Sequence, residues 1–144
     1  MSSMELENKL KAYYMTAIFS IVFAVVGFSY NAWRLELSED NNNIRSASFK
    51  VLTVLAELEQ IIYAAHYDKD VKEGSPRKGW VKVGLIVDLS SLISDSSEER
   101  AQKLKAVWQK NWDIMMDDID ATTILVNEID YMRSEIKLTL KELE

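Results

Sequence analysis

The chain has 144 residues, enough for one domain of ordinary size, and its formal net charge is −6 at pH 7. An acidic surface repels phosphate backbones, which argues against a nucleic-acid partner, and the absence of cysteine excludes disulfides, thiolate nucleophiles and cysteine metal sites. Only four glycines and one proline interrupt the chain, so the composition predicts a mainly α-helical fold.

The first predicted element is an apolar helix from Ala12 to Trp33, which contains no charged residue. Its length of about 22 residues exceeds the roughly 20 that a helix needs to cross ~30 Å of hydrocarbon. Tyrosine and tryptophan rings, which prefer the headgroup region, lie at both ends of the stretch. We therefore predict a transmembrane helix at 12–33, preceded by a short tail at 1–11. The aromatic residues at the two ends are Tyr13, Tyr14, Tyr30 and Trp33.

A cleavable signal peptide is the main alternative for this stretch. Lys9 and Lys11 precede the apolar run, and Gly27-Phe28-Ser29 weakly imitates a cleavage site. The run is long for the apolar region of a signal peptide, so the pattern favours a permanent anchor.

The orientation of the predicted span depends on the basic residues that flank it. Lys9 and Lys11 come before the span, whereas three basic residues follow it within about 20 positions, so the count alone does not decide. A short tail with two lysines is typical of a cytoplasmic segment, and the acidic domain beyond resembles translocated cargo. We predict a protein of the bacterial inner membrane, with the N-terminus in the cytoplasm and the soluble domain in the periplasm.

Small or polar residues follow one face of the predicted span at intervals of 3 and 4. Such a face lets another helix approach closely, although small residues are common in single spans and the pattern also fits chance. We predict a membrane-helix interface formed by Ala17, Ser20, Ala24, Gly27 and Asn31.

Beyond the span, a juxtamembrane segment at 34–43 precedes a soluble helical bundle at 44–144. The residues from Ser38 to Asn43 are polar and poor helix formers, so they form either a hinge or a continuation of the membrane helix. The next helix has a seam whose members alternate 4 and 3 apart, as in helices that pack along one line. These residues are Ile44, Ser48, Val51, Leu55, Leu58, Ile62 and Ala65.

Another helix is predicted from about Lys78 to Ile93, with Trp80, Val83, Val87 and Leu92 near helical spacing. Its middle, "WVKVGLIVDL", also has strand propensity. A lone strand has no pairing partner in a helical chain, so we favour the helix.

The last region starts with a predicted capping box, in which Ser96 caps a helix and Glu99 closes the box. It continues to Glu144 either as one rod or as two helices with a hinge near residues 117–120. We predict an antiparallel bundle of three or four helices, with oligomerisation covering any overhang. The seam of this region is formed by Leu104, Trp108, Asn111, Met115, Asp118, Thr122, Leu125, Ile129, Met132 and Ile136.

Few residues point to chemistry. His66 lies near a helix C-terminus, where a protonated ring and carbonyl capping are favoured, and with Asp70 it would make only half of a metal site. Asp88 is the acid that we expect to be drawn inward, paired with Arg45, Lys82 or a nearby serine, or alternatively contacting a ligand.

Two further groups of residues have a structural and a functional interpretation. Asn111 and Asp118 are expected to fix the register of the last seam. The aromatic residues Trp80, Trp108 and Trp112 line a pocket or, as we favour, pack in the core.

The sequence contains no glycine-rich phosphate loop, no Ser-His-Asp set and no His-x-x-x-His pair. Asp117, Asp118 and Asp120 lack the spacing and the glycine of a calcium loop. We therefore expect no enzymatic activity, no cofactor and no metal.

Two stretches carry a resemblance: "YNAWRLELSEDNNNIRSASFKVLTVLAELEQIIYAAHYDKD" and "RKGWVKVGLIVDLSSLI". Together they resemble a group of small, uncharacterised single-pass membrane proteins of Gram-negative bacteria, a resemblance that brings no catalytic or ligand motif. In architecture the chain is also similar to the extracytoplasmic helical sensor domains of chemoreceptors. It departs from them in having no second span or signalling domain, so we do not expect signalling by their route.

The sequence as a whole predicts a non-catalytic scaffolding or accessory protein, anchored in the lipid bilayer and contacting a second copy or another membrane protein through its helices. The alternative is a ligand-sensing bundle that relays occupancy to a companion membrane protein. Its candidate ligand or partner contacts are Asp88, Trp80 and Trp108.

Overall fold

The computed structural model describes residues 2–143, so Met1 and Glu144, the outer ends of the predicted tail and bundle, lie outside the described residues. All regular elements in this range are helices, which confirms the mainly α-helical class. The strand alternative for "WVKVGLIVDL" is wrong, because these residues belong to a helix. The helices are α1 (Ser3–His66), α2 (Pro76–Ser90), α3 (Asp95–Asn111) and α4 (Ile119–Glu142).

The chain divides into two compact units, Met1–Asp40 and Asn41–Glu144. The described part of the first unit lies within α1 except for Ser2. Its large apolar side chains are exposed, from Leu37 at 45% to Phe28 at 77%. By length and composition α1 could cross a membrane, and the apolar window that meets this criterion is 0% buried within the chain.

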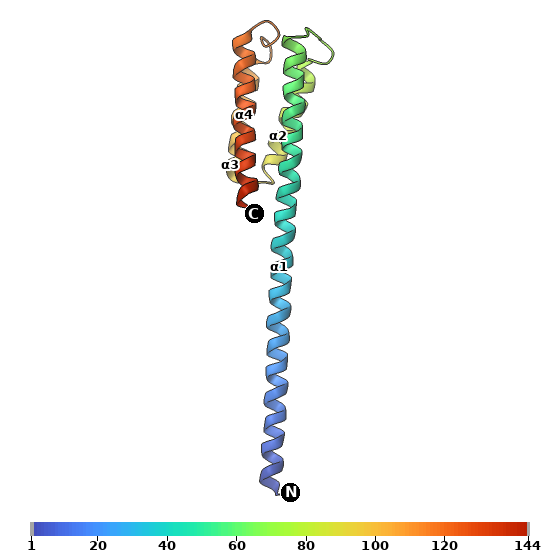
Figure 1. Ribbon diagram of the computed structural model, residues 1–144, viewed down its shortest axis with the longest axis vertical. Helices are drawn as coiled ribbons and strands as arrows, with labels where there is room; N and C mark the ends of the chain where they lie inside the picture. The colour runs from blue at the N-terminus through green and yellow to red at the C-terminus, as the bar shows by residue number, and fades with distance from the viewer. Residues whose placement is uncertain (1, 144) are drawn as a thin grey trace. The chain divides into compact units, whose positions relative to one another are not determined.

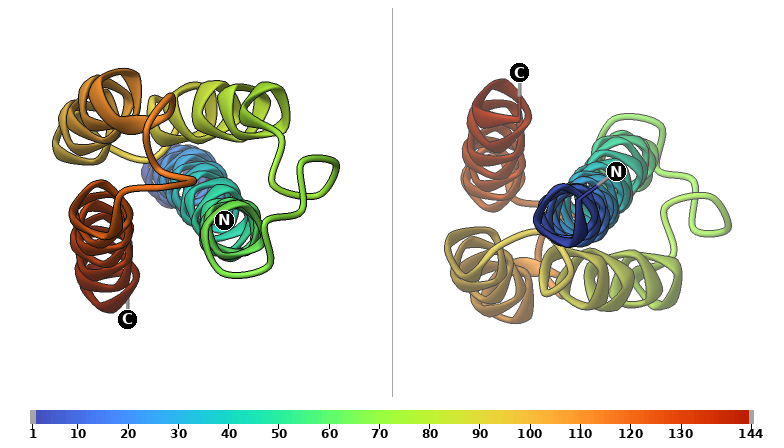
Figure 2. Two further views of the ribbon diagram at one scale, coloured as in Figure 1. Left: turned by 90° about the horizontal axis from the view of Figure 1, so that it is seen from above. Right: turned by 90° about the horizontal axis from the view of Figure 1, so that it is seen from below.

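The second unit is a four-helix bundle formed by α2, α3, α4 and the C-terminal part of α1 (Figure 1). Viewed from its end, the four helices surround one core, and consecutive helices run in opposite directions (Figure 2). At one end of the bundle, Arg45 Nη2 donates a hydrogen bond of 2.8 Å to the Leu143 carbonyl. At the other end, His66 Nδ1 lies 2.9 Å from the Met115 carbonyl oxygen.

The predicted seam of the first bundle helix is confirmed. Six of its seven residues are buried, from Ser48 to Ala65, and Ile44 is half-buried. A helix with such a stripe is stable in water only when other helices cover it. The largest fully buried side chains of the bundle come from all four helices and from the α3–α4 connection. They are Trp108, Leu55, Leu58, Ile62, Ile86, Leu104, Met115, Leu125, Ile129, Met132, Ile136 and Val51.

Ion pairs at the edge of the core join three of the four pairs of neighbouring helices. Lys82 Nζ of α2 lies 2.6 Å from Glu57 Oε2 of α1, and Arg100 Nη2 of α3 lies 2.8 Å from Glu128 Oε1 of α4. Arg133 of α4 pairs with Glu59 of α1. Misplacing any helix would leave these partly buried charges unpaired, so the pairs favour one helix order.

The fourth pair, α2 and α3, is joined by close packing. A Cβ atom added to Gly79 would lie 2.2 Å from ring atoms of Trp108, so the indole rests directly on the glycine. Glycine is therefore the one residue that lets α2 approach the Trp108 ring this closely.

Three predicted helix boundaries are wrong by two or three residues. The second bundle helix begins at Pro76, with proline in its first turn, and ends at Ser90, so Leu92 lies outside the helix and is exposed. The cap of α3 is Ser94 rather than Ser96, because Ser94 Oγ accepts a hydrogen bond of 3.1 Å from the Ser97 amide. Ser96 instead donates to Glu135 of α4.

The last region forms two helices, separated at residues 112–118. Asp118 is exposed and caps α4, since its Oδ1 accepts from the Asp120 and Ala121 amides at 2.8 and 3.1 Å. The expectation that Asp118 fixes the seam is therefore wrong: a capping side chain ends the helical periodicity there. Asn111, at the end of α3, donates to the Val107 carbonyl of its own helix.

The two glycines of α2 provide a matched test of the packing. Gly79→Ala should lower the free energy of unfolding of the bundle by about 1–3 kcal/mol, because the new methyl group overlaps Trp108. Gly84→Ala should raise it by about 0.5–1 kcal/mol, because nothing lies within 4 Å of the added atom and alanine favours helix. Denaturant unfolding followed by circular dichroism measures both. Equal effects of the two substitutions would contradict the described packing.

Candidate functional site

The predicted aromatic and acidic contacts are only partly brought together. Trp80 and Trp108 pack edge to face, with ring centroids 6.4 Å apart. Trp108 is fully buried and Trp80 is half-buried, so both belong to the core packing. Trp112 is half-buried and packs against the same core.

Asp88 lies on the exposed side of α2, so the expectation that it is drawn inward is wrong. The helix buries Val83, Ile86 and Ser90 on one face, and the helical repeat places Asp88 on the opposite face. A role of Asp88, Trp80 and Trp108 in contacting a ligand or partner stays a prediction.

The five residues of the predicted membrane-helix interface are all exposed. Around Gly27 an added Cβ atom would meet nothing within 4 Å, and Ser20 Oγ donates to the Thr16 carbonyl of its own helix at 2.9 Å. The face is thus open and its hydroxyl is satisfied. Its use as an interface stays a prediction.

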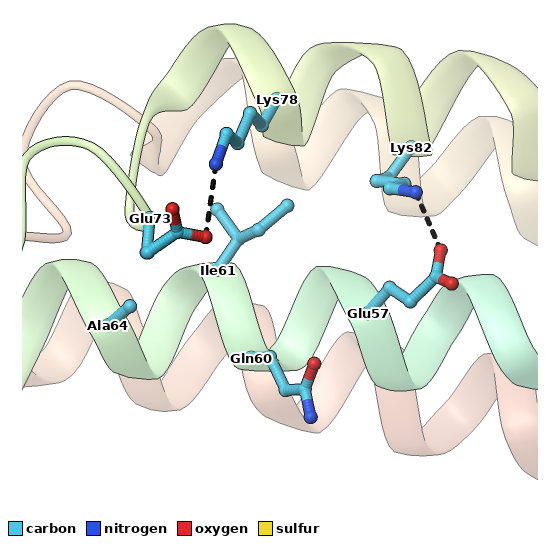
Figure 3. Close-up of a pocket in the computed structure, with 7 residues that line it drawn as sticks. All are labelled: Glu57, Gln60, Ile61, Ala64, Glu73, Lys78 and Lys82. Atoms are coloured by element: carbon cyan, nitrogen blue, oxygen red, sulfur yellow. Dashed lines mark hydrogen bonds and ion pairs between the residues drawn. The ribbon is translucent and has the colours of Figure 1, made fainter.

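A groove of about 440 Å³ runs between α1 and α2 (Figure 3). Its charges are paired: Lys78 lies 3.1 Å from Glu73, and Lys82 lies 2.6 Å from Glu57. The hydrogen bond from Lys82 lowers the pKa of Glu57 below its ordinary value. Because these carboxylates and ammonium groups satisfy one another, the charges of the groove are neutralised within it. Sequence reasoning missed it, since the side chains that meet there depend on how two consecutive helices pack. The lining residues are Glu57, Gln60, Ile61, Ala64, Glu73, Lys78 and Lys82.

A polar network joins α1 and α4. Arg133 bridges Glu59 of α1 and Asp130 of its own helix, and Tyr63 donates to Glu59 Oε1 at 3.1 Å. The hydrogen bond to Glu59 raises the pKa of Arg133, while partial burial and the bond to Glu59 raise the pKa of Tyr63. Both shifts favour the protonated forms, a charged Arg133 and a neutral Tyr63, and the pairing of Arg133 with Glu59 holds α4 against α1.

His66 connects the end of α1 to the segment between α3 and α4. Its Nδ1 must donate to the Met115 carbonyl, because a carbonyl oxygen only accepts, and Thr122 Oγ1 donates to the same oxygen at 2.8 Å. Lys69 approaches the same segment and pairs with Asp117 at 3.2 Å. His66 was expected to cap carbonyls at the end of its own helix, but it instead binds a carbonyl of the α3–α4 connection.

Within residues 2–143, no group of three or more histidine, aspartate or glutamate side chains is placed to hold a metal ion. Compared with models of protein families, with curated proteins and with solved structures, the chain matches none of them. The resemblance to small, uncharacterised membrane proteins of Gram-negative bacteria stays a prediction from the sequence.

Two carboxylates with lowered pKa values, Asp70 in the loop after α1 and Glu57 in the groove, predict how the free energy of unfolding depends on acid pH. Backbone amides of Glu73 and Lys72 donate to Asp70 and lower its pKa, and Lys82 lowers that of Glu57. A carboxylate with a lowered folded-state pKa stabilises the fold above its unfolded pKa, and this contribution is lost as the pH falls through the folded value. Bundle stability should therefore decrease from about pH 5 to about pH 3.

Asp70→Asn and Glu57→Gln should each make this pH dependence shallower, as measured by denaturant midpoints at a series of pH values. Asp88→Asn is the matched control, because no hydrogen bond or ion pair of the Asp88 side chain occurs among the described residues. If Asp88→Asn made the pH dependence of the denaturant midpoint as shallow as the other two variants do, the total charge of the chain, rather than these contacts, would set that dependence.

Proposed function

We propose that the chain is a membrane-anchored scaffolding or accessory protein, held in the bacterial inner membrane by residues 12–33 and acting through its helical bundle. The observation that carries the proposal is the exposure of the apolar stretch: its large side chains, such as Phe19 at 58% and Phe23 at 74%, have no cover within the chain. Water would make such a surface costly, at roughly 25 cal/mol per Å² of apolar area. A lipid bilayer is the solvent that this helix fits by length, composition and aromatic ends.

A binding role, rather than catalysis, is supported by how the polar groups of the bundle are used. The ion pairs that lie between helices, such as Lys82–Glu57 and Arg100–Glu128, satisfy each other. His66 is committed to a backbone carbonyl. Side chains already paired in this way stabilise a shape, and the remaining exposed surface is what a partner would contact.

The ligand-sensing alternative has less support. It would need Asp88 and the two tryptophans to share a site, but Trp108 is 0% exposed and Asp88 lies on the outer face of α2. The scaffolding proposal needs no such site.

Extraction of membranes with alkaline carbonate tests the anchor. We expect the full chain to stay in the membrane pellet. The double variant Val22→Arg/Val26→Arg should move to the supernatant, because each arginine near the middle of a span costs about 2.5–3.5 kcal/mol of insertion energy. Phe49→Arg/Leu92→Arg, with two exposed bundle residues changed, is the matched control and should stay in the pellet. Release of the unmodified chain would overturn the proposal.

Labelling of single cysteines tests the proposed orientation, and the chain has no cysteine of its own. In spheroplasts with an intact inner membrane, a membrane-impermeant maleimide should label Ala106→Cys, at an exposed site of α3. It should leave Ser2→Cys unlabelled until the membrane is permeabilised. The opposite result would place the bundle in the cytoplasm while leaving the anchor itself intact.

A further inference from the structure

Two exposed stripes of the bundle carry no charge, although the chain is 28% charged. Within each stripe the residues alternate 3 and 4 apart, so they follow one face of their helix. All ten side chains are exposed. The α1 stripe is Phe49, Thr53, Ala56, Gln60 and Tyr63, and the α4 stripe is Ile124, Asn127, Tyr131, Ser134 and Leu138.

The two stripes match residue by residue when they run in opposite directions. The paired residue numbers then add to the same value in all five pairs. Apolar residues meet at the two ends, polar residues meet between them, and a small residue meets a large one at the centre. The pairs are Phe49–Leu138, Thr53–Ser134, Ala56–Tyr131, Gln60–Asn127 and Tyr63–Ile124.

The polar members of the stripes suit a contact without water. Thr53 Oγ1 and Ser134 Oγ each donate to a carbonyl of their own helix at 3.0 Å, so they bring no unsatisfied hydroxyl donor. Among residues 2–143, the side-chain amides of Gln60 and Asn127 have no hydrogen-bond partner. The Gln60 side chain points away from α2 (Figure 3). Each carries a donor and an acceptor, so the two amides can satisfy each other when paired.

The stripes also lie at the same height along the bundle. Within one chain, Arg45 contacts Leu143 and Glu59 contacts Arg133, which fixes how α1 and α4 are aligned. Two copies standing side by side in the same orientation therefore bring the α1 stripe of one level with the α4 stripe of the other. Two chains anchored in one membrane are both tethered at the Asn41 end of their bundles, which favours that orientation, so this step rests on the proposed function.

The two stripes point in different directions. Tyr131 of the α4 stripe contacts Arg100 of α3, with the guanidinium carbon 4.8 Å from the ring centroid. The α1 stripe lies between Glu57, which faces α2, and Glu59, which faces α4. Each copy would thus use α1 toward one neighbour and α4 toward another. Such a head-to-tail contact closes into a ring when the rotation between copies allows it.

We propose that copies of this chain assemble side by side, with the α1 stripe of one copy packed against the α4 stripe of the next. Helices that run in opposite directions and share 3–4 spacing interlock in this way. The second copy, rather than another protein, is the occupant because the chain itself carries both halves of the matched pattern.

Cysteine cross-linking in native membranes tests the pairing. Two full-length variants, Ala56→Cys and Tyr131→Cys, are co-expressed and mildly oxidised. We expect a disulfide-linked dimer that contains one copy of each variant, and none when either variant is expressed alone. The pair Ala56→Cys and Gln109→Cys, with the second cysteine on the exposed face of α3, is the matched control and should not cross-link. A dimer of Ala56→Cys alone, or no 56–131 dimer, would overturn the proposal.

Exchange of the central small and large residues gives an independent readout. In mild detergent, Ala56→Tyr and Tyr131→Ala should each raise the dissociation constant of the assembly at least about tenfold, while the double variant Ala56→Tyr/Tyr131→Ala should recover the original value. Ala106→Tyr, at an exposed alanine of α3, should leave association unchanged, and circular dichroism confirms folding of each variant. A monomeric unmodified chain, or a double variant no better than the singles, would overturn the inference. Carbonate extraction reports separately on the membrane anchor, so the two proposals can fail independently.

Discussion

The bundle depends on one stripe of α1, formed by the buried side chains between Ala47 and Ala65. Every other helix contributes to the core that covers this stripe. The remaining helices have 15, 17 and 24 residues, and in proteins most of a helix's stability comes from tertiary packing of its amphipathic face. Their stability therefore comes from burial against α1 and against each other. The apolar side chains in the first unit of the same helix have no such cover within the chain.

The polar contacts determine which arrangement of the four helices is adopted. Apolar burial alone is tolerant of helix order, because leucine, isoleucine and valine pack against many neighbours. Partly buried ion pairs are less tolerant, since a separated partner leaves a charge without compensation. Glu57 and Glu59, two positions apart on α1, face different helices and so fix α2 on one side and α4 on the other.

Much of the fold follows from periodicity, and the departures have identifiable causes. The α1 seam was predictable because seven positions alternate regularly, and the structure buries or half-buries all of them. The break before α4 was harder to predict, because Asp118 fits both a seam position and a helix cap. Only its hydrogen bonds from the Asp120 and Ala121 amides identify it as a cap. The sequence favoured Ser96 as the cap of α3 because Glu99 follows three residues later, whereas in the structure the Ser97 amide donates to Ser94. The groove beside Glu57 and Lys82 could not be predicted, since it depends on how distant segments are placed side by side.

The contact between Gly79 and Trp108 has a consequence for how the sequence can vary. The indole occupies the space where any side chain at position 79 would begin, so the two positions share one volume. A larger residue at 79 avoids a loss of stability only when a smaller one replaces the tryptophan, and a smaller residue at 108 leaves a void unless position 79 fills it. These two sites, on different helices, are thus expected to change together, and that coupling would mark other chains that share this bundle even where the rest of their sequence has diverged.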